Sequence, residues 1–266
     1  MAQNDSGHIA DVYLNYIGGQ WKQGSSAQWD ENRNPANPNE LLGKITRSAP
    51  LDVNRAIEAA QIAQVEWARK PRPARGQILA KAGDLLRARA DVLAKILTRE
   101  EGKNIAEAKG EVLKACNVLE FTASEARRPI GEVIPSEVPN TFLYTTRAPL
   151  GVVAVITPWN FPVCIPVWKI APALLEGNAV IFKPASLTPA TATFVTRTFE
   201  EAGLPPGVLN LVYGGGATIG MALASDPRVH AISFTGSNDV GREVYARAAS
   251  RLARVQLEMG GKNPII

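Results

Sequence analysis

The fold is decided by a segment that begins Gly151-Val-Val-Ala-Val-Ile-Thr157 and continues to Gly177-Asn-Ala-Val-Ile-Phe-Lys183. Its two β-branched runs, at 152–156 and 179–182, are short, apolar and bounded by glycine and proline, which is typical of strands. The residues between the runs suffice for one helix. Because parallel strands need a helical crossover of about this length, the segment predicts a strand-helix-strand unit in a parallel sheet.

The same alternation continues towards the end of the chain. Three further apolar runs, separated by segments with helical spacing, are expected to form strands at 208–213, 230–234 and 254–257. Five strands that alternate with helices predict an α/β fold with one open parallel sheet and helices on its flanks.

The amino-terminal segment differs in residue composition from the strand-and-helix region. Residues 1–11 are polar and are expected to form a mobile leader, without the pattern of a secretory signal or membrane anchor. The Gly18-Gly19 pair within 13–21 predicts a hairpin turn. Residues 33–42 are rich in asparagine and proline and are expected to form a loop.

Helical spacing of apolar residues begins at Asp52, a candidate N-cap. The pattern predicts helices at 52–67, 77–97 and 104–127, the last ending before a proline and a glycine. An amino-terminal helical segment is therefore expected ahead of the sheet.

Composition excludes several classes of function. The net charge of +4 is modest, and basic residues alternate with acidic ones, so a nucleic-acid partner is not implied. No apolar run approaches membrane-spanning length. The 266 residues contain two cysteines, Cys116 and Cys164, and two histidines, which favours a reducing, cytoplasmic location with neither disulfides nor a metal site.

Residues 135–148 interrupt the helical pattern just before the sheet begins. Bulky and polar side chains alternate from Val138 to Arg147, which favours an extended strand outside the helical layer. Such an excursion is expected to meet another subunit rather than to fold as an isolated hairpin. The alternative is an edge strand of the same domain.

Polar side chains follow the first two predicted strands at their carboxyl ends, the edge at which ligands bind in open α/β sheets. They are Thr157, Trp159 and Asn160 after the first strand and Lys183 and Ser186 after the second. Pro158 and Pro162 restrict the loop around Asn160, so its amide is a candidate oxyanion donor. The alternative is that this amide only satisfies the backbone of a tight turn.

A phosphate site is expected at Gly236-Ser-Asn-Asp-Val-Gly241, which follows a strand and opens a helix. Free amides and the Ser237 hydroxyl would hold the phosphate there. The alternative is that these residues serve only the geometry of the turn. The usual dinucleotide fingerprint is absent, because Ile219 stands where a third glycine would follow Gly214 and Gly216.

Taken together, these motifs resemble the aldehyde dehydrogenase superfamily in order and spacing, most of all its NADP-using semialdehyde dehydrogenases. The resemblance runs from Tyr13 to the last residue. The motifs that carry it are Pro158-Trp-Asn-Phe-Pro162, Lys169, Lys183-Pro-Ala-Ser186, Phe234-Thr-Gly-Ser237 and Leu257-Glu-Met-Gly-Gly-Lys262. It implies a Rossmann-like cofactor-binding domain formed by 1–134 and 149–257, an oligomerisation strand at 135–148, and the start of a catalytic domain at 258–266.

The resemblance also implies roles for individual residues. Asn160 would donate its amide to the oxyanion of a thiohemiacetal, and Glu258 would be the general base that activates water. Lys169 would support a proton path to Glu258. The alternative for Lys169 is a surface charge at the end of a long side chain that lies along a helix.

The implied cofactor is NADP or NAD. Residues expected to bind it are Thr157, Pro158, Trp159, Lys183, Ser186, Gly216, Phe234, Thr235, Gly236, Ser237, Glu258 and Gly260. Among them, Lys183 would bond the adenosine ribose, and Trp159 and Phe234 would line the cofactor cleft. NADP is favoured, because Ser186 stands where NAD-preferring relatives often carry a glutamate that repels the 2′-phosphate.

The nucleophile of the resembled family is a cysteine further along than Ile266, the last residue. Cys116 and Cys164 match no nucleophile position, and the apolar neighbours of Cys164 predict that it is buried. The chain is therefore expected to be inactive alone, as the amino-terminal portion of a homo-oligomeric enzyme, dimer or tetramer, that oxidises an aldehyde such as a semialdehyde. The alternative is a non-catalytic dinucleotide-binding or interaction module.

Overall fold

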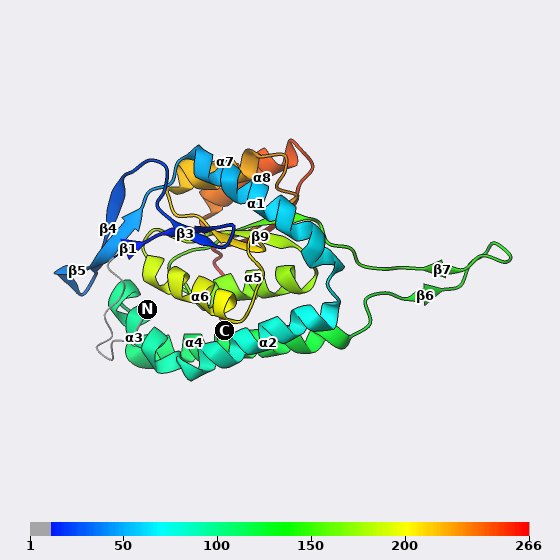
Figure 1. The fold of residues 1–266 in the computed structure, drawn as a ribbon, viewed down its shortest axis with the longest axis horizontal. Coiled ribbons are helices and arrows are strands. Elements are labelled where there is room, and N and C mark those ends of the chain that lie inside the picture. The colour runs from blue at the N-terminus through cyan, green and yellow to red at the C-terminus, as the bar shows by residue number, and fades with distance from the viewer. Residues whose placement is uncertain (1–11, 266) are drawn as a thin grey trace.

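A computed structural model describes residues 12–265, so the predicted leader lies outside the described residues. An open seven-stranded sheet, in the order β12-β11-β8-β9-β10-β2-β3, forms the middle of the molecule (Figure 1). Its strands are β2 (Asn15–Ile17), β3 (Gln20–Lys22), β8 (Val152–Ile156), β9 (Ala179–Lys183), β10 (Leu209–Leu211), β11 (Ala231–Gly236) and β12 (Arg254–Met259). The last five of these are parallel, which confirms the predicted α/β fold.

The β-branched run in β8 explains why helices cover both faces of the sheet. Val152, Ala154 and Ile156 pack into one core cluster, and Val153 and Val155 pack into the other. All residues of β8 and β9 are buried. This is the pattern expected of parallel strands between two helical layers.

The helices lie in three groups around the sheet (Figure 1). On one face are α1 (Pro50–Arg69), α7 (Met221–Ser225) and α8 (Asn238–Ala249). On the other are α5 (Cys164–Leu175) and α6 (Pro189–Glu201), covered in turn by α2 (Arg72–Ala88), α3 (Ala90–Glu101) and α4 (Ile105–Ser124). A 3-10 turn at Glu125–Arg127 follows α4, and a π-helical turn, η2 (Gly216–Gly220), precedes α7.

The predicted glycine hairpin is confirmed. Strands β2 and β3 are antiparallel, with Gly18 and Gly19 at positive φ values of 60° and 82°. Two consecutive residues at positive φ form the tight hairpin turn that glycine accommodates. This hairpin extends the sheet beyond β10 with antiparallel strands.

The predicted loop at 33–42 is wrong. Strands β4 (Trp29–Asn34) and β5 (Asn37–Thr46) form a hairpin, and β1 (Val12–Tyr13) pairs with β5 in parallel. The Asn34 side chain accepts a hydrogen bond from the Ala36 amide at 2.9 Å, closing a two-residue turn. The asparagine and proline residues therefore form the turn of a hairpin here and not a loop.

The single helix predicted at 77–97 is also wrong. The helix breaks at Arg89, whose φ of −112° and ψ of 16° lie outside the helical region, between α2 and α3. The Arg89 guanidinium pairs with Glu201 of α6 at 2.6 Å. No glycine or proline marks this break in the sequence.

Asp52 caps α1 from within the helix. The helix begins at Pro50, and the Asp52 carboxylate accepts the Ala49 amide at 2.9 Å and the Ser25 amide at 2.8 Å. Asp52 is therefore the third helical residue rather than the N-cap, with a carboxylate that satisfies a free amide at the helix start. The predicted third helix is confirmed, with Asn104 as its N-cap.

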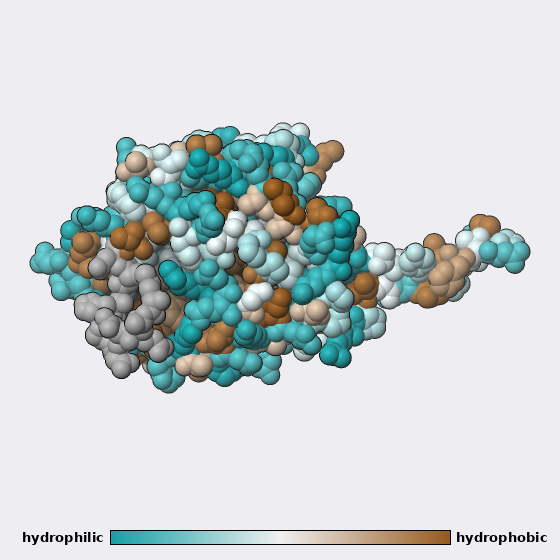
Figure 2. All heavy atoms as spheres, in the orientation of Figure 1, coloured by the Kyte–Doolittle hydropathy of each residue, from teal (hydrophilic) through white to brown (hydrophobic). Residues whose placement is uncertain are grey.

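Residues 133–144 project from the body as a narrow arm of two strands, β6 (Val133–Ile134) and β7 (Leu143–Tyr144) (Figure 1). The arm is an isolated hairpin that pairs with itself, which the prediction disfavoured, and the edge-strand alternative is also wrong. Of the strand predicted from Val138 to Arg147, only Leu143–Tyr144 pairs in a ladder. Hydrophobic side chains gather along it (Figure 2), among them Phe142, 73% exposed, and Tyr144, 61% exposed.

A buried arginine joins the ends of two helices beneath the sheet. The Arg75 guanidinium donates to the Leu175 carbonyl at 2.8 Å, the Lys70 carbonyl at 2.5 Å and the Ala68 carbonyl at 3.1 Å. These carbonyls lie at the carboxyl ends of α5 and α1, where helices leave carbonyls unsatisfied.

We expect Arg75→Met to lower the free energy of unfolding by about 3 kcal/mol, because it leaves several buried carbonyls without a donor. Urea denaturation followed by circular dichroism measures this. Arg69→Met is the matched control, since the Arg69–Glu66 ion pair is exposed, and it should change stability by less than about 1 kcal/mol. Equal effects of the two substitutions would contradict the assigned role of Arg75.

Candidate active site

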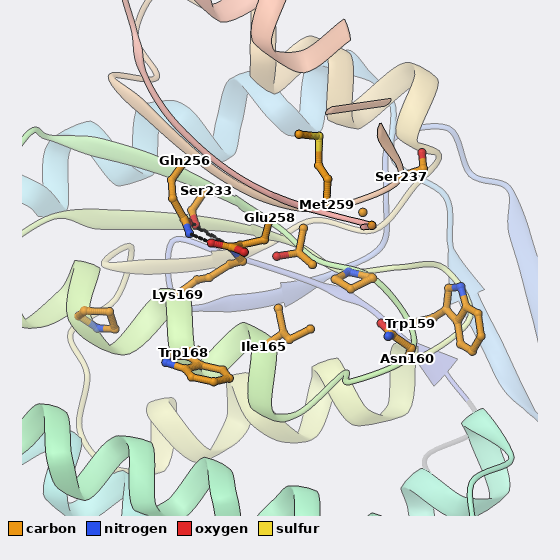
Figure 3. Close-up of a pocket in the computed structure, with 15 residues that line it drawn as sticks. Trp159, Asn160, Ile165, Trp168, Lys169, Ser233, Ser237, Gln256, Glu258 and Met259 are labelled. Carbon is orange, nitrogen blue, oxygen red and sulfur yellow. Dashed lines mark hydrogen bonds between the residues drawn. The ribbon is translucent and has the colours of Figure 1, made fainter. Parts of the chain in front are cut away.

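A cleft of about 1100 Å³ opens at the carboxyl edge of the parallel sheet (Figure 3). It lies between the loop after β8, helix α5, and the ends of β11 and β12. Nine of the predicted site residues line it: Pro158, Trp159, Asn160, Lys169, Thr235, Gly236, Ser237, Glu258 and Gly260. The strand ends thus gather side chains that are far apart in the sequence, as the topology requires.

Glu258 and Lys169 are linked through a glutamine (Figure 3). The Gln256 amide donates to the Glu258 carboxylate at 2.9 Å, and the Lys169 ammonium donates to the Gln256 carbonyl oxygen at 3.2 Å. Lys169 also donates to the Ser233 hydroxyl at 2.9 Å. The alternative of a surface charge at Lys169 is therefore wrong, since its ammonium is held inside the cleft.

Burial changes the acidity of this lysine. Desolvation lowers the pKa of Lys169 to about 8, and the nearby negative charge of Glu258 opposes the shift. A neutral amine is consequently accessible close to physiological pH. This is the range in which a group takes up and releases protons efficiently.

Asn160 lies in the exposed turn between β8 and α5. Its backbone carbonyl accepts a hydrogen bond from the Lys103 ammonium at 2.9 Å. Among the described residues, no hydrogen bond engages its side-chain amide, so that amide does not serve the turn. It is available to a ligand in the cleft.

The turn into α8 places backbone amides at the cleft. Ser237 is the N-cap, and its hydroxyl accepts the Val240 amide at 3.4 Å. At Gly236 a Cβ atom would lie 2.5 Å from the Phe234 ring, so only glycine fits. Phe234 itself packs into the core and is 3% exposed, and it does not line the cleft.

The other predicted cofactor residues form a second group at the ends of β8 and β9. The Thr157 amide donates to the Lys183 carbonyl at 3.2 Å, which brings the two residues together. A Cβ atom at Gly220 would lie 4.0 Å from the Lys183 side chain, so η2 passes beside it. Ser186 and Gly216 are exposed, and a Cβ atom at Gly216 would meet open space.

Two buried polar groups in this second group lack ordinary partners among the described residues. The Lys183 ammonium is 5% exposed and donates only to the Pro184 carbonyl, at 3.0 Å, so burial lowers its pKa to about 8. The Thr157 hydroxyl is buried without a hydrogen bond. Unpaired buried groups are costly, and a ligand rich in hydroxyl oxygens would satisfy them.

The chain is similar to known proteins along nearly its whole length. The profile described as the aldehyde dehydrogenase family matches residues 21–266. The chain belongs to this family. It is 46% identical to the α-ketoglutaric semialdehyde dehydrogenase of Bacillus subtilis (strain 168) over 256 residues, which are 96% of this chain and 52% of that protein. The chain thus spans about half the length of the curated relatives that it matches.

Solved structures of aldehyde dehydrogenases share the fold. A 3,6-anhydro-L-galactose dehydrogenase in complex with NADP superposes with a TM-score of 0.90 at 37% identity, covering 94% of this chain and 52% of that one. Betaine aldehyde dehydrogenase of Staphylococcus aureus in complex with NAD+ gives a TM-score of 0.93 at 33% identity, covering 97% of this chain and 51% of that one.

Both cysteines of this aldehyde dehydrogenase chain are free and buried. Burial raises the pKa of Cys164 to about 11, and neither cysteine lines the cleft. The prediction that Cys164 is buried is confirmed. A protonated, enclosed thiol is a poor nucleophile.

The sequence interpretation missed several residues that line the aldehyde dehydrogenase cleft. Ile165, Trp168 and Pro172 form one face of α5 together with Lys169, and Trp168 is 52% exposed. Their spacing relative to Lys169, which places them on one face of a helix, could have identified them in the sequence. Gln256 precedes Glu258 by two positions in β12, which places both side chains on one face of the strand.

Among the described residues, no group of three or more histidine, cysteine, aspartate or glutamate side chains could hold a metal ion. Within the same part of the chain, no helix combines the length and apolar character needed to cross a membrane.

We expect lysine NMR signals to show two groups that titrate near pH 8, Lys169 and Lys183, each lost in its own Lys→Met variant. Glu258→Gln should lower the Lys169 midpoint further, because it removes the charge that favours the ammonium. The Lys183 midpoint should stay in place, since burial alone shifts it. A Lys169 midpoint that does not respond would contradict the coupling to Glu258.

Both lysines also make stability depend on pH. Each pKa lies below the ordinary value of 10.5, so the unfolded chain binds more protons between about pH 8 and 10.5. Their contribution to stability therefore increases as the pH rises through that window.

Proposed function

We propose that this chain binds NAD(P)+ and supplies the oxyanion donor and general base for oxidation of an aldehyde to a carboxylic acid. The observation that carries the proposal is the hydrogen-bonded series Glu258–Gln256–Lys169 in the same cleft as the free Asn160 amide. Family membership and the cofactor-bound relatives support it. The cofactor-binding part would comprise 1–134 and 149–257, and 258–266 would begin the catalytic part.

The geometry of the cleft supports a role for each of these residues. The Asn160 amide would donate a hydrogen bond to the aldehyde oxygen as a thiolate of the carboxyl-terminal half, which this chain does not supply, adds to the carbonyl. Loss of hydride from that adduct would leave a thioester for water to hydrolyse. Glu258, oriented by Gln256, would take a proton from the water that releases the acid. Lys169 would support the path by which that proton leaves. A bound nicotinamide would accept the hydride.

The second group of residues fits the adenosine half of the cofactor. The Lys183 ammonium, which has one protein acceptor, and the unpaired Thr157 hydroxyl match ribose oxygens, and the start of α8 at Ser237 matches a phosphate. Ser186 and Gly216 are exposed, so both are open to contact with a bound cofactor.

The substrate class comes from the relatives of the chain. The Bacillus subtilis relative is named an α-ketoglutaric semialdehyde dehydrogenase. We infer an aldehyde that also carries a carboxylate, with α-ketoglutaric semialdehyde as the first compound to assay.

The function is tested with two preparations. The purified 266-residue chain should bind cofactor but not oxidise the semialdehyde, because both of its thiols are buried. A chimera of this chain with the carboxyl-terminal half of the Bacillus subtilis relative should oxidise it, and Asn160→Ala should lower kcat of the chimera about 100-fold.

Three outcomes would contradict this function. Turnover by the chain alone that disappears in Cys164→Ala would make Cys164 a nucleophile. A folded chimera that binds cofactor but does not oxidise the aldehyde would indicate that this chain is a non-catalytic binding module. Absence of cofactor binding by the chain would refute the assigned site.

Cofactor choice is expected to depend on Ser186. A small hydroxyl near the Lys183 ammonium admits a 2′-phosphate, so NADP+ should bind at least as tightly as NAD+. Ser186→Glu should shift the preference to NAD+ by repelling the phosphate. Calorimetric titration of both cofactors measures this preference. A clear preference of the unchanged chain for NAD+ would contradict the role assigned to Ser186.

The arm is proposed as a contact between subunits of a homo-oligomer in the cytoplasm. Exposed Phe142 and Tyr144 on a two-stranded ribbon favour association, because such a ribbon gains little stability alone. The chain should therefore associate or aggregate, and Phe142→Ser with Tyr144→Ser should reduce this. A clean monomer of the unchanged chain by light scattering at high concentration would refute the proposal.

A further inference from the structure

Lys103 lies between α3 and α4, away from every predicted site residue in the sequence, yet its ammonium reaches the loop that carries Asn160. It donates to the Asn160 carbonyl at 2.9 Å and to the Glu111 carboxylate at 2.7 Å. It lies 4.3 Å from the centre of the Phe161 ring and 3.9 Å from the Glu101 carboxylate. Its side chain is 10% exposed and that of Glu111 is 1% exposed, so their ion pair is largely out of water, whereas the hydrogen bond to the Asn160 carbonyl lies at the surface.

Glu111 completes the connection from the other side. Its second carboxylate oxygen accepts the backbone amides of Val163 at 2.8 Å and Cys164 at 3.0 Å. These amides open α5, where a helix has unpaired donors and a favourable dipole for an anion. The buried carboxylate is thus bound both by the start of α5 and by the Lys103 ammonium.

One ion pair therefore holds the whole turn between β8 and α5. Lys103 fixes its middle, at Asn160 and Phe161, and Glu111 fixes its end, at Val163. The prolines at 158 and 162 restrict only their own φ angles and disfavour some conformations of the residue before them. The Lys103 hydrogen bond to the Asn160 carbonyl adds a restraint that the prolines do not provide.

We propose that the Lys103–Glu111 pair is a positioning device that aims the Asn160 amide at the aldehyde oxygen. The inference rests on the proposed function of Asn160. Neither residue of the pair lines the cleft, so both act through the turn. An oxyanion donor is effective only when it is held in place before the charge develops.

The kinetic test uses the active chimera. Lys103→Met removes the donor to the Asn160 carbonyl and should lower kcat about 10- to 100-fold, as expected for a misplaced catalytic group. The KM for cofactor should stay within about twofold, because Lys183 and Ser237 are unchanged. Lys103→Arg retains the charge and its donors and should restore most of kcat.

Lys109→Met is the matched control. Lys109 lies on α4 and pairs with Asp91 at 2.7 Å, but both side chains are exposed. This variant should keep kcat and KM. A similar loss in Lys109→Met and Lys103→Met would overturn the proposal, as would a Lys103→Met variant with unchanged kcat or one in which cofactor KM rises as kcat falls.

A second measurement uses the 266-residue chain and does not depend on catalysis. Hydrogen exchange at Val163 and Cys164, and thiol labelling of Cys164 in a Cys116→Ala background, report opening of the turn. Both should become faster in Lys103→Met while exchange in β9 stays slow, and Lys103→Arg should reverse the change. Glu111→Gln, which keeps an acceptor oxygen but removes the charge, should act in the same direction and serves if Lys103→Met does not fold.

The two measurements separate the inference from the function on which it rests. An inactive chimera refutes the proposed function, and exchange in the chain still decides whether the pair holds the turn. Exchange that is unaltered in the folded variants refutes the positioning role, whatever the activity.

Discussion

Burial of β8 and β9 on both faces is the constraint on which the rest of the structure depends. Helices cover each side of these strands, so no side chain within them reaches solvent. The polar residues of the site must therefore lie at the ends of the strands, as Lys183 does, or follow them. Because parallel strands end at the same edge, the turn that carries Asn160, the start of α8 at Ser237, and Glu258 converge there without any long loop.

The electrostatics of the site follow from the same arrangement. Lys169 and Lys183 both lose hydration at the sheet edge, and neither has a carboxylate within hydrogen-bonding distance among the described residues. Lys169 is held by neutral oxygens and senses Glu258 only across Gln256. Burial thus brings the pKa of both amines down to about 8, one beside the proposed base and one at the end of β9.

The elements that could be predicted from the sequence are those that residues close together in the chain determine. The apolar runs predicted all five parallel strands, and the Gly18-Gly19 pair predicted its hairpin. The prolines on either side of Asn160 indicated it as a candidate oxyanion donor. The break at Arg89 carries no local signal, because its partner Glu201 lies more than one hundred residues away.

The partners of the site residues could not be predicted for the same reason. Gln256 is visible as a neighbour of Glu258 on one strand face, but its bond to Lys169 requires β12 to lie against β11. In the sequence, Lys103 and Glu111 resemble ordinary solvated charges, one just before a helix and one on it. Only the packing of α4 against α5 reveals that they hold the turn with Asn160.

The position of β2 has a consequence for how the chain reaches this fold. Tyr16 pairs with Leu211, and the Asn15 side chain accepts the Tyr213 amide at 2.9 Å. The β2–β3 hairpin can close within microseconds as an isolated unit, but its docking site is synthesised almost two hundred residues later. On the ribosome the amino-terminal hairpin must therefore wait for β10, and the entropy of closing so long a loop makes this contact a late step. Until that step, the outer edge of β10 offers its backbone groups to any other extended chain nearby, so the interval between synthesis and docking is when aggregation competes with folding.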